Sequence, residues 1–277
     1  MNGISRNIHL AWLPLAGLFL FPAQTTLSEE SLFLDEDLEE AVREHIFGDG
    51  PLTAETLGNL SILHAKKRGI RDLAGLEHAT KLALLDVADN DVTDLGPIKG
   101  LIYLQSLDLS GNQITDLTHL RGLTRLQYLK LSGNRISDLE PLRNLESLNS
   151  LYLSRNQITD LSLLKGLTKL WTLDLEGNRV SDLKPLANLT RLSSLNLTAN
   201  LVSDLSPLAG SREWRSLLLQ DNQVKDLAPL VDMAKKDFAG EKRFAPFWHI
   251  YLSGNPLTLS ARQDQIEQLK EYGVRVQ

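Results

Sequence analysis

The residues best able to do chemistry in this 277-residue chain are acidic side chains that recur at one spacing. An aspartate is found every 22 residues, at Asp72, Asp94, Asp116, Asp138, Asp160, Asp182, Asp204 and Asp226. A Ca²⁺ ion needs six to eight oxygens converging on one point, and a single file with one carboxylate per unit does not supply them. Each aspartate precedes a turn that often contains proline, as a helix N-cap does. We therefore expect these aspartates to cap short helices and to bind no metal.

Motifs for catalysis or cofactor binding are absent from the sequence. It contains no G-x-S-x-G, no H-E-x-x-H, no phosphate-binding glycine loop and no G-x-G-x-x-G. It also lacks cysteine, which excludes disulfides, thiolate catalysis and cysteine-based zinc sites. The six histidines are scattered, and a lone surface histidine is more often solvated than catalytic. We expect no enzyme activity and no cofactor.

An asparagine that recurs at a fixed spacing defines a repeat in the chain, and the second set of candidate functional residues is located relative to it. It stands at Asn90, Asn112, Asn134, Asn156, Asn178, Asn200 and Asn222, and Asn255 follows after 33 residues. Apolar residues keep fixed offsets around it, in the pattern L-x-x-L-x-L-x-x-N-x-I-x-D-L. A period in the low twenties with this spacing indicates a solenoid, and solenoids commonly bind other molecules along one extended surface.

Each repeat is predicted to contain one short strand, one turn and one short helical turn. The leucines at alternate positions point inward from the strand, and the strands of neighbouring repeats pair in parallel about 4.8 Å apart. The asparagine amide has donors and an acceptor that can satisfy the backbone of its own turn and of the adjacent one. The fold class expected is therefore an α/β solenoid with a concave parallel sheet and convex helical turns.

Binding residues are expected where strand side chains point out of the concave face, which is six, four and two residues before each asparagine. Most of these residues are small or polar, and two groups differ. Near the middle of the repeats, two tyrosines and two cations are flanked by carboxylates; these candidates are Tyr128, Lys130, Tyr152, Arg155, Asp174 and Glu176. Near the C-terminal end, the candidates are His249 and Tyr251. Exposed tyrosine with arginine is typical of interface hot spots. Alternatively, these aromatic side chains only cover the sheet.

The ends of the chain differ from the repeats. An apolar run from Leu10 to Phe21, followed by the small residues around Ala23, predicts a signal peptide over residues 1–25. About 20 apolar residues are needed to span a bilayer, and this run is shorter. An uncleaved anchor or a disordered tail are the alternatives. We expect no stable membrane insertion once the leader is removed.

Helical caps are expected on both sides of the repeats, because terminal repeats would otherwise expose their core. Residues 26–59 are predicted as an N-terminal helical cap, with one helix starting near Asp35 and another running from Thr53 to Leu60. The repeats span 60–259. Residues 260–277 are predicted as a C-terminal cap of one helix and one strand, the helix opening with a capping box at Ser260. The extra residues before Asn255 are expected to lengthen one convex helix.

The repeat pattern and the helical segment before it resemble those of the bacterial internalin-like leucine-rich repeat proteins. The resemblance covers about 57–255 and implies a leucine-rich repeat solenoid that binds a protein, or a surface polymer, on its concave face. No Leu-Pro-x-Thr-Gly motif and no immunoglobulin-like pattern follow the repeats, so the host-receptor role of internalins is not carried over.

Two locations fit such a protein. The leader favours an exported protein, secreted, periplasmic or at the cell surface. The alternative is an intracellular regulatory subunit similar to the leucine-rich repeat proteins that control phosphatases. The formal net charge of −6 argues against a nucleic-acid partner.

Overall fold

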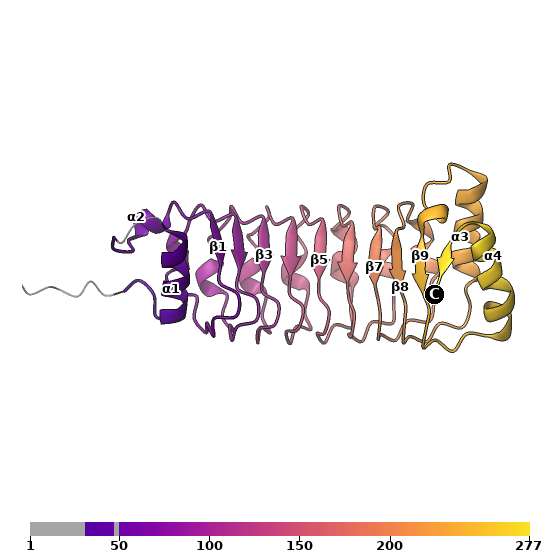
Figure 1. Ribbon diagram of the computed structural model, residues 1–277, viewed down its shortest axis with the longest axis horizontal. Coiled ribbons are helices and arrows are strands. Elements are labelled where there is room, and N and C mark those ends of the chain that lie inside the picture. The colour runs from indigo at the N-terminus through magenta and orange to yellow at the C-terminus, as the bar shows by residue number, and fades with distance from the viewer. Residues whose placement is uncertain (1–30, 47–49) are drawn as a thin grey trace, which may run out of the picture. The chain divides into compact units, whose positions relative to one another are not determined.

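The computed structural model describes residues 31–46 and 50–277, and its central feature is one parallel sheet (Figure 1). Ten strands lie side by side in chain order. They are β1 (Ile62–His64), β2 (Leu84–Asp86), β3 (Ser106–Asp108), β4 (Tyr128–Lys130), β5 (Ser150–Tyr152), β6 (Thr172–Asp174), β7 (Ser194–Asn196), β8 (Ser216–Leu218), β9 (His249–Tyr251) and β10 (Arg275–Val276). The predicted α/β leucine-rich repeat solenoid is confirmed.

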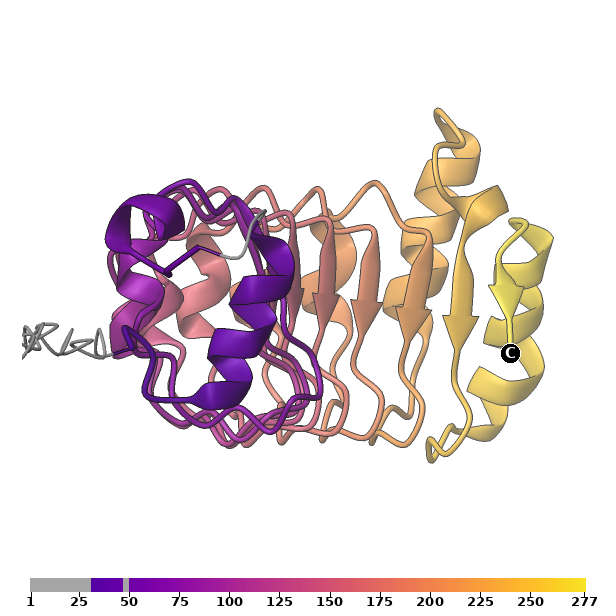
Figure 2. The same cartoon turned by 60° about the vertical axis from the view of Figure 1, so that its left-hand side comes forward.

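Short helices cover the opposite side of this sheet (Figure 2). Most are single 3₁₀ turns: η1 (Leu76–His78), η2 (Gly96–Ile98), η3 (Thr118–Leu120), η4 (Glu140–Leu142), η5 (Ser162–Gly166), η6 (Lys184–Leu186), η7 (Ser206–Gly210) and η8 (Ala245–Phe247). The middle residue of each three-residue strand from β1 to β9 is buried and its two neighbours are not. The leucines therefore fill the space between sheet and helices, and alternate side chains are left on the concave face.

The asparagines form the structural ladder that was predicted. The Asn156 amide nitrogen donates to the carbonyl oxygens of Leu131 at 2.9 Å and Leu153 at 3.0 Å. Its amide oxygen accepts from the Ile136 nitrogen at 3.0 Å. Leu131 and Ile136 belong to the preceding repeat, so the side chain joins two turns of the solenoid. The same set of bonds recurs at Asn112, Asn134, Asn178, Asn200 and Asn222.

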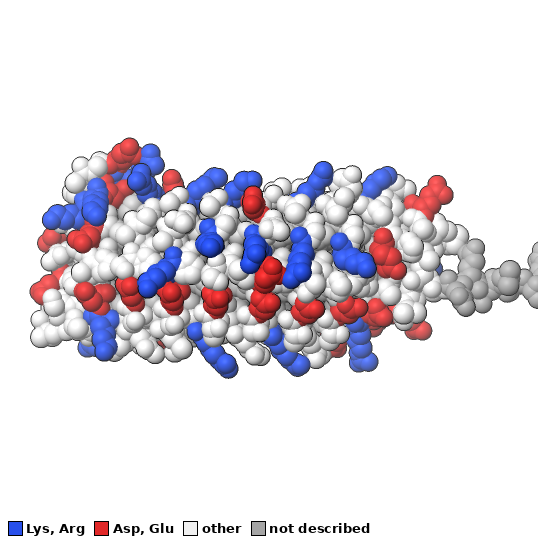
Figure 3. Space-filling view, turned by 180° about the vertical axis from the view of Figure 1, so that it is seen from behind, with Lys and Arg blue, Asp and Glu red and all other residues white. Residues whose placement is uncertain are grey.

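The aspartate column is structural, although its geometry differs from the predicted N-caps. The Asp94 carboxylate accepts from the Gly96 nitrogen at 2.8 Å, and Leu95 between them holds the cap position. Leu95 is 1 % exposed, so the core requires a leucine at the cap and the aspartate acts from one residue earlier, as an Asx-turn. Seen from the side of the helices, acidic side chains form a row along the solenoid (Figure 3).

Two helices precede the sheet. Helix α1 (Glu36–His45) begins as predicted: the Asp35 side chain accepts from the Leu38 nitrogen at 3.0 Å. The second carboxylate oxygen of Asp35 accepts from the Arg71 nitrogen at 2.7 Å, which ties α1 to the first repeat. Helix α2 (Ala54–Leu57) starts with a capping box at Thr53 and ends earlier than expected. The signal peptide predicted over residues 1–25 lies outside the described residues.

Two longer helices and the last strand follow β8. Helix α3 (Ala228–Ala239) contains much of the insertion, as expected, and α4 (Ile266–Glu271) continues from a π-helical turn over Ala261–Gln265. The predicted capping box at Ser260 is wrong. Ser260 is already helical, with φ −63° and ψ −40°, and the Thr258 hydroxyl accepts from the Ala261 nitrogen at 3.1 Å. Within the part of the chain that is described, no helix is long and apolar enough to cross a membrane.

Candidate functional site

The strand register brings three of the predicted residues into one cluster, Tyr128, Lys130 and Tyr152. Lys130 on β4 pairs directly with Tyr152 on β5, and Tyr128 is on the same face of β4. The two tyrosine rings are tilted by 53°, with centroids 5.4 Å apart. The Lys130 ammonium is 5.3 Å from the Tyr128 centroid and 5.6 Å from that of Tyr152. A cation held over two aromatic faces is stabilised by their quadrupoles.

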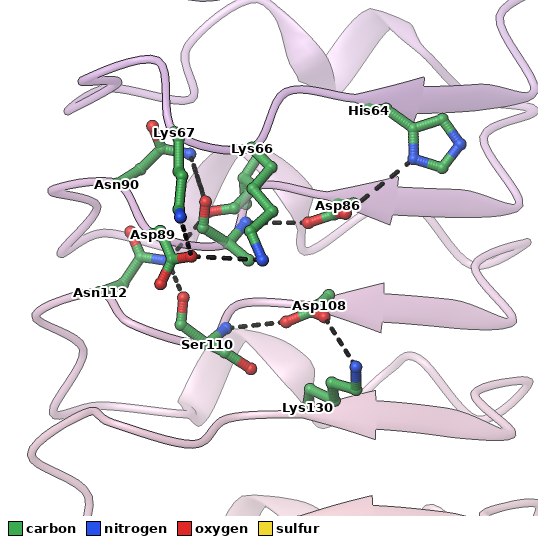
Figure 4. Close-up of polar contacts among 12 residues, drawn as sticks. His64, Lys66, Lys67, Asp86, Asp89, Asn90, Asp108, Ser110, Asn112 and Lys130 are labelled. Carbon is green, nitrogen blue, oxygen red and sulfur yellow. Dashed lines mark hydrogen bonds and ion pairs between the residues drawn. The ribbon is translucent and has the colours of Figure 1, made fainter.

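Neighbouring groups and burial shift the pKa values of two members of this cluster, Lys130 and Tyr152. The Lys130 ammonium lies 3.4 Å from the Asp108 carboxylate (Figure 4). The Tyr128 hydroxyl, and after it Asp108, raises the pKa of Lys130 above its ordinary value. Burial, and then the proximity of Tyr128, raises the pKa of Tyr152. At neutral pH, therefore, Lys130 is charged and the Tyr152 phenol is neutral. A neutral phenol can donate and accept hydrogen bonds.

The carboxylates on the next strand form a second group beside this cluster. The Asp174 carboxylate accepts from the Glu176 nitrogen at 3.1 Å, and burial raises the pKa of Asp174. Glu176 accepts from the Asn196 amide at 3.2 Å and lies 3.9 Å from the Arg155 guanidinium. Arg155 follows the end of β5, in a turn, and its side chain is 78 % exposed. Arg155 is thus at the rim of the concave face, paired with Glu176.

His249 and Tyr251 form a separate area. Both are on β9, four strands from β5 in the sheet order, with Ile250 buried between them. The Arg275 guanidinium on β10 lies 3.1 Å from His249 Nε2. The structure therefore places these two residues near the C-terminal end of the concave face and does not join them to the central cluster.

Acidic side chains outnumber basic ones on the seven regular repeats of the concave face, a property that the sequence analysis did not single out. At the positions six, four and two residues before the seven regularly spaced asparagines, four side chains are acidic and one is basic: Asp86, Asp108, Asp174 and Glu176 against Lys130. Reading the strand positions together, rather than searching for aromatic residues, would have found this imbalance.

The basic side chains at the N-terminal end of this face already have acidic neighbours. Lys66 lies 3.3 Å and Lys67 4.0 Å from the Asp89 carboxylate, and His64 lies 4.0 Å from Asp86 (Figure 4). No group of three or more His, Asp or Glu side chains in 31–46 or 50–277 is placed to hold a metal ion. What the described face offers is a polar surface with one aromatic, cationic cluster.

Comparisons with known proteins are consistent with this architecture. Models described as "Leucine Rich repeats (2 copies)" match residues 124–166 and 168–210, and one described as "Leucine rich repeat" matches 80–136. A comparison with curated protein sequences gives no match.

Solved structures give closer relationships. The chain is 30 % identical to internalin InlF from Listeria monocytogenes, covering 88 % of this chain and 71 % of that one, with a TM-score of 0.77. It is 34 % identical to internalin C2 from the same organism, covering 82 % of this chain and 95 % of that one, with a TM-score of 0.72. A leucine-rich repeat protein from Leptospira interrogans is 21 % identical, covers 82 % of this chain and 62 % of its own, and has a TM-score of 0.66. This last similarity concerns the fold alone.

Proposed function

The chain belongs to the internalin-like family of leucine-rich repeat proteins, and from this premise we propose that it is an exported, non-catalytic scaffold that binds another protein on its concave face. Leucine-rich repeat proteins of this type are generally protein-binding scaffolds. Partner binding is assigned here to the central cluster of Tyr128, Lys130 and Tyr152, with Arg155, Asp174 and Glu176 at its border.

The observation that carries this proposal is the packing of two half-exposed tyrosines around one lysine. Tyrosine brings a large, rigid contact area with little side-chain entropy to lose, and its hydroxyl supplies a hydrogen bond. The three side chains are already held together before a partner arrives, which reduces the ordering cost of binding. Aromatic residues near the centre of a contact surface, with polar residues around them, are typical of binding hot spots.

The charges around the cluster indicate the chemistry of the partner. Asp108 lies 3.4 Å from Lys130, Asp174 and Glu176 lie on the far side of Tyr152, and acidic side chains outnumber basic ones on the strands of the regular repeats. Complementary charge speeds encounter and excludes wrong partners. The partner surface is therefore expected to be basic, with an apolar group that fits against the tyrosine rings and an acidic group opposite Lys130. His249 and Tyr251 would form a second contact at the end of the same face.

Export is the part of the proposal that separates it from the intracellular alternative. The apolar run from Leu10 to Phe21 supports a leader, and removal near Thr25 would release the chain outside the cytoplasm. N-terminal sequencing of the protein from its native host checks this. An intact Met1 on a cytosolic product would instead support the regulatory subunit.

The concave site is tested with the double variant Tyr128→Ala, Tyr152→Ala. Proteins captured from the native host are first identified with the parent, and the affinity of the main partner is then measured by calorimetry. If the two tyrosines are hot spots, the double variant loses at least about 2 kcal/mol of binding free energy. Thermal stability should change little, because neither ring belongs to the buried core.

The matched control removes two exposed aromatic side chains from a different surface, Tyr103→Ala with Trp171→Ala. These residues are 46 % and 43 % exposed and precede their strands. The control should keep the affinity of the parent for the protein partner. Equal affinity of parent and Tyr128, Tyr152 variant would move the site, and His249 with Tyr251 would be examined next.

A further inference from the structure

A second surface differs in charge from the concave face: the long edge at which the strands begin. It is formed by the residues ten, nine and seven positions before the seven regularly spaced asparagines. Six of these side chains are basic and two are acidic: Lys81, Arg125, Lys169, Arg191, Arg212 and Arg215 against Glu146 and Glu213. Lys and Arg side chains follow this edge along the top of Figure 3. In a protein of net charge −6, this edge therefore carries an excess of four positive charges, six basic side chains against two acidic ones.

The backbone holds the edge residues in a line. The Gln127 nitrogen donates to the Gln105 oxygen at 2.9 Å, and the Asn149 nitrogen donates to that of Gln127 at 2.8 Å. The line continues through Trp171 to Arg215, one residue per repeat. Neighbouring positions are therefore about 4.8 Å apart, the spacing of paired strands. The residues seven before each asparagine therefore form a row along the solenoid axis, and the positions nine and ten before it, which hold the other five cations, repeat beside this row with the same period.

The six cations are available for a ligand. All six residues are exposed, and none forms a salt bridge with any residue that the structure describes. By contrast, Lys130 on the concave face is paired with Asp108. Arg125 lies 4.6 Å from the centroid of the Tyr103 ring, and Arg215 lies 5.6 Å from that of Phe247. These two cations are positioned without being neutralised.

Exposed aromatic and amide side chains lie between the cations. Tyr103, Trp171 and Phe247 are 46 %, 43 % and 54 % exposed, large fractions for apolar rings. Gln105, Gln127 and Asn149 are exposed on three successive repeats between Tyr103 and Trp171. Amides donate and accept hydrogen bonds in the way that hydroxyl groups require, and aromatic rings offer flat apolar faces.

From this combination we infer that the edge binds a linear anionic polysaccharide lying along the solenoid axis. The cations pair with its carboxylate or sulfate groups, the amides bond to its hydroxyls, and Tyr103 and Trp171 contact the apolar faces of sugar rings. The same narrow set of positions recurs once per repeat along the axis, which suits a single extended chain. Binding to an anionic membrane would favour apolar side chains in place of the three amides. The acidic charge of the remaining surface disfavours nucleic acid.

The test uses the full chain and three glycan probes: size-defined heparin oligosaccharides, polygalacturonate and neutral dextran. Affinity is measured by calorimetry at several salt concentrations, because ion pairing weakens as salt rises. The parent should bind at least one anionic probe and not dextran. Preference for heparin or for polygalacturonate distinguishes a sulfated from a carboxylated polymer. Failure to bind either anionic probe overturns the inference.

Two triple variants separate this edge from general charge. The edge variant is Lys169→Gln, Arg191→Gln, Arg215→Gln. The control removes the same residue types from the opposite edge, Arg135→Gln, Arg179→Gln, Lys225→Gln, and so has the same net charge. The edge variant should lose at least 10-fold in affinity for the anionic glycan and show a weaker salt dependence, while the control stays within about twofold of the parent. Equal losses in both would mean unspecific charge attraction and would overturn the inference.

The aromatic pair completes the test. Tyr103→Ala with Trp171→Ala should weaken glycan binding severalfold at constant charge. The variant Tyr128→Ala, Tyr152→Ala should leave it unchanged, so failure of this inference and failure of the concave protein site give different results. Tighter, equally edge-dependent binding to single-stranded DNA or to phosphatidylglycerol vesicles would replace the polysaccharide by that ligand and overturn the assignment.

Discussion

At the residue scale, one backbone requirement of the concave face is met by two different side chains. Four residues before the repeat asparagine, the side chains of Asp86, Asp108 and Asp174 accept from the backbone nitrogen two residues on, at 3.0 to 3.1 Å. Asn196 makes the same bond to Thr198 at 3.0 Å. The turn therefore needs an oxygen acceptor and not a charge. The negative charge at the other three positions is therefore not required by the turn, and that of Asp108 is paired with Lys130.

This equivalence predicts a pH effect for Asp174→Asn. Burial raises the pKa of Asp174 in the folded state above its unfolded value near 3.8, so the folded protein binds the proton more tightly. The stability contributed by this group is present below the unfolded pKa and is lost as pH rises through the folded pKa. Asparagine does not titrate and keeps the turn bond. Asp174→Asn should thus melt at a higher temperature than the parent at pH 7, with the gap closing near pH 3.

Asp116→Asn is a control of opposite sign. Bonds from the Thr118 hydroxyl and then from its backbone nitrogen lower the pKa of Asp116, so its stabilisation is present above the unfolded value and lost as pH falls. This variant should be less stable than the parent at pH 7. Paired melts at pH 3 and pH 7 measure both differences. The same sign for both variants would contradict the assignment of Asp174 as the destabilised carboxylate.

At the scale of the repeat, the turn after each strand has a strict backbone requirement. The residue directly before the repeat asparagine has a positive φ in every repeat from Asn90 on. Glycine fills the position in some repeats, as at Gly133 with φ 68°, and other residues in the rest, as at Ala199 with φ 55°. A side chain with a Cβ is strained there, by about 1–2 kcal/mol. The repeats are therefore not equal in stability.

Reciprocal substitutions should reveal this inequality. Gly133→Ala should lower the free energy of unfolding by about 1–2 kcal/mol. The cost comes from the backbone alone, because a Cβ there would lie 3.6 Å from its nearest neighbours, an ordinary contact. Ala199→Gly should raise stability by up to about 1 kcal/mol, reduced by the greater freedom of glycine when unfolded. Urea denaturation measures both, and a loss of stability in Ala199→Gly would contradict the strain argument.

How much the sequence could predict depends on whether one residue determines a feature. The hydrogen bonds of Asn156 to the backbone of two neighbouring turns could be predicted from the sequence. A polar side chain that recurs at one position of an apolar repeat is expected to satisfy buried backbone groups. The proximity of Tyr128 and Tyr152 could also be predicted, because the 22-residue period places them on adjacent strands. The helix start at Ser260 was predicted wrongly, because Thr258 two residues earlier is an equally good cap and only packing decides between them. The basic edge was missed because its cations are spread over three loop positions with no strand periodicity.

At the scale of the whole solenoid, each repeat contacts mainly its two neighbours, so stability is nearly a sum of local terms. The first repeat has no repeat before it. Helix α1 lies there instead, with Leu38, Ala41 and Val42 buried, and the His64 nitrogen at the edge of β1 donates to His45 Nε2 at 3.2 Å. We expect α1 to act as the cap that protects the first strand from fraying and from pairing with other chains.

The same substitution at two places tests this expectation. Leu38 and Leu129 are both fully buried, so Leu→Ala removes similar apolar contacts in each case, worth about 2–5 kcal/mol. In Leu38→Ala the loss falls on a terminal element, which can detach while the remaining repeats stay folded. Amide hydrogen exchange should therefore accelerate in α1 and β1 and stay slow from β4 to β7.

In Leu129→Ala the damaged repeat has neighbours on both sides, and exchange should accelerate on both flanks with a larger fall in melting temperature. Uniform acceleration along the chain in Leu38→Ala would mean that the solenoid unfolds as one unit, and that α1 stabilises all of it equally.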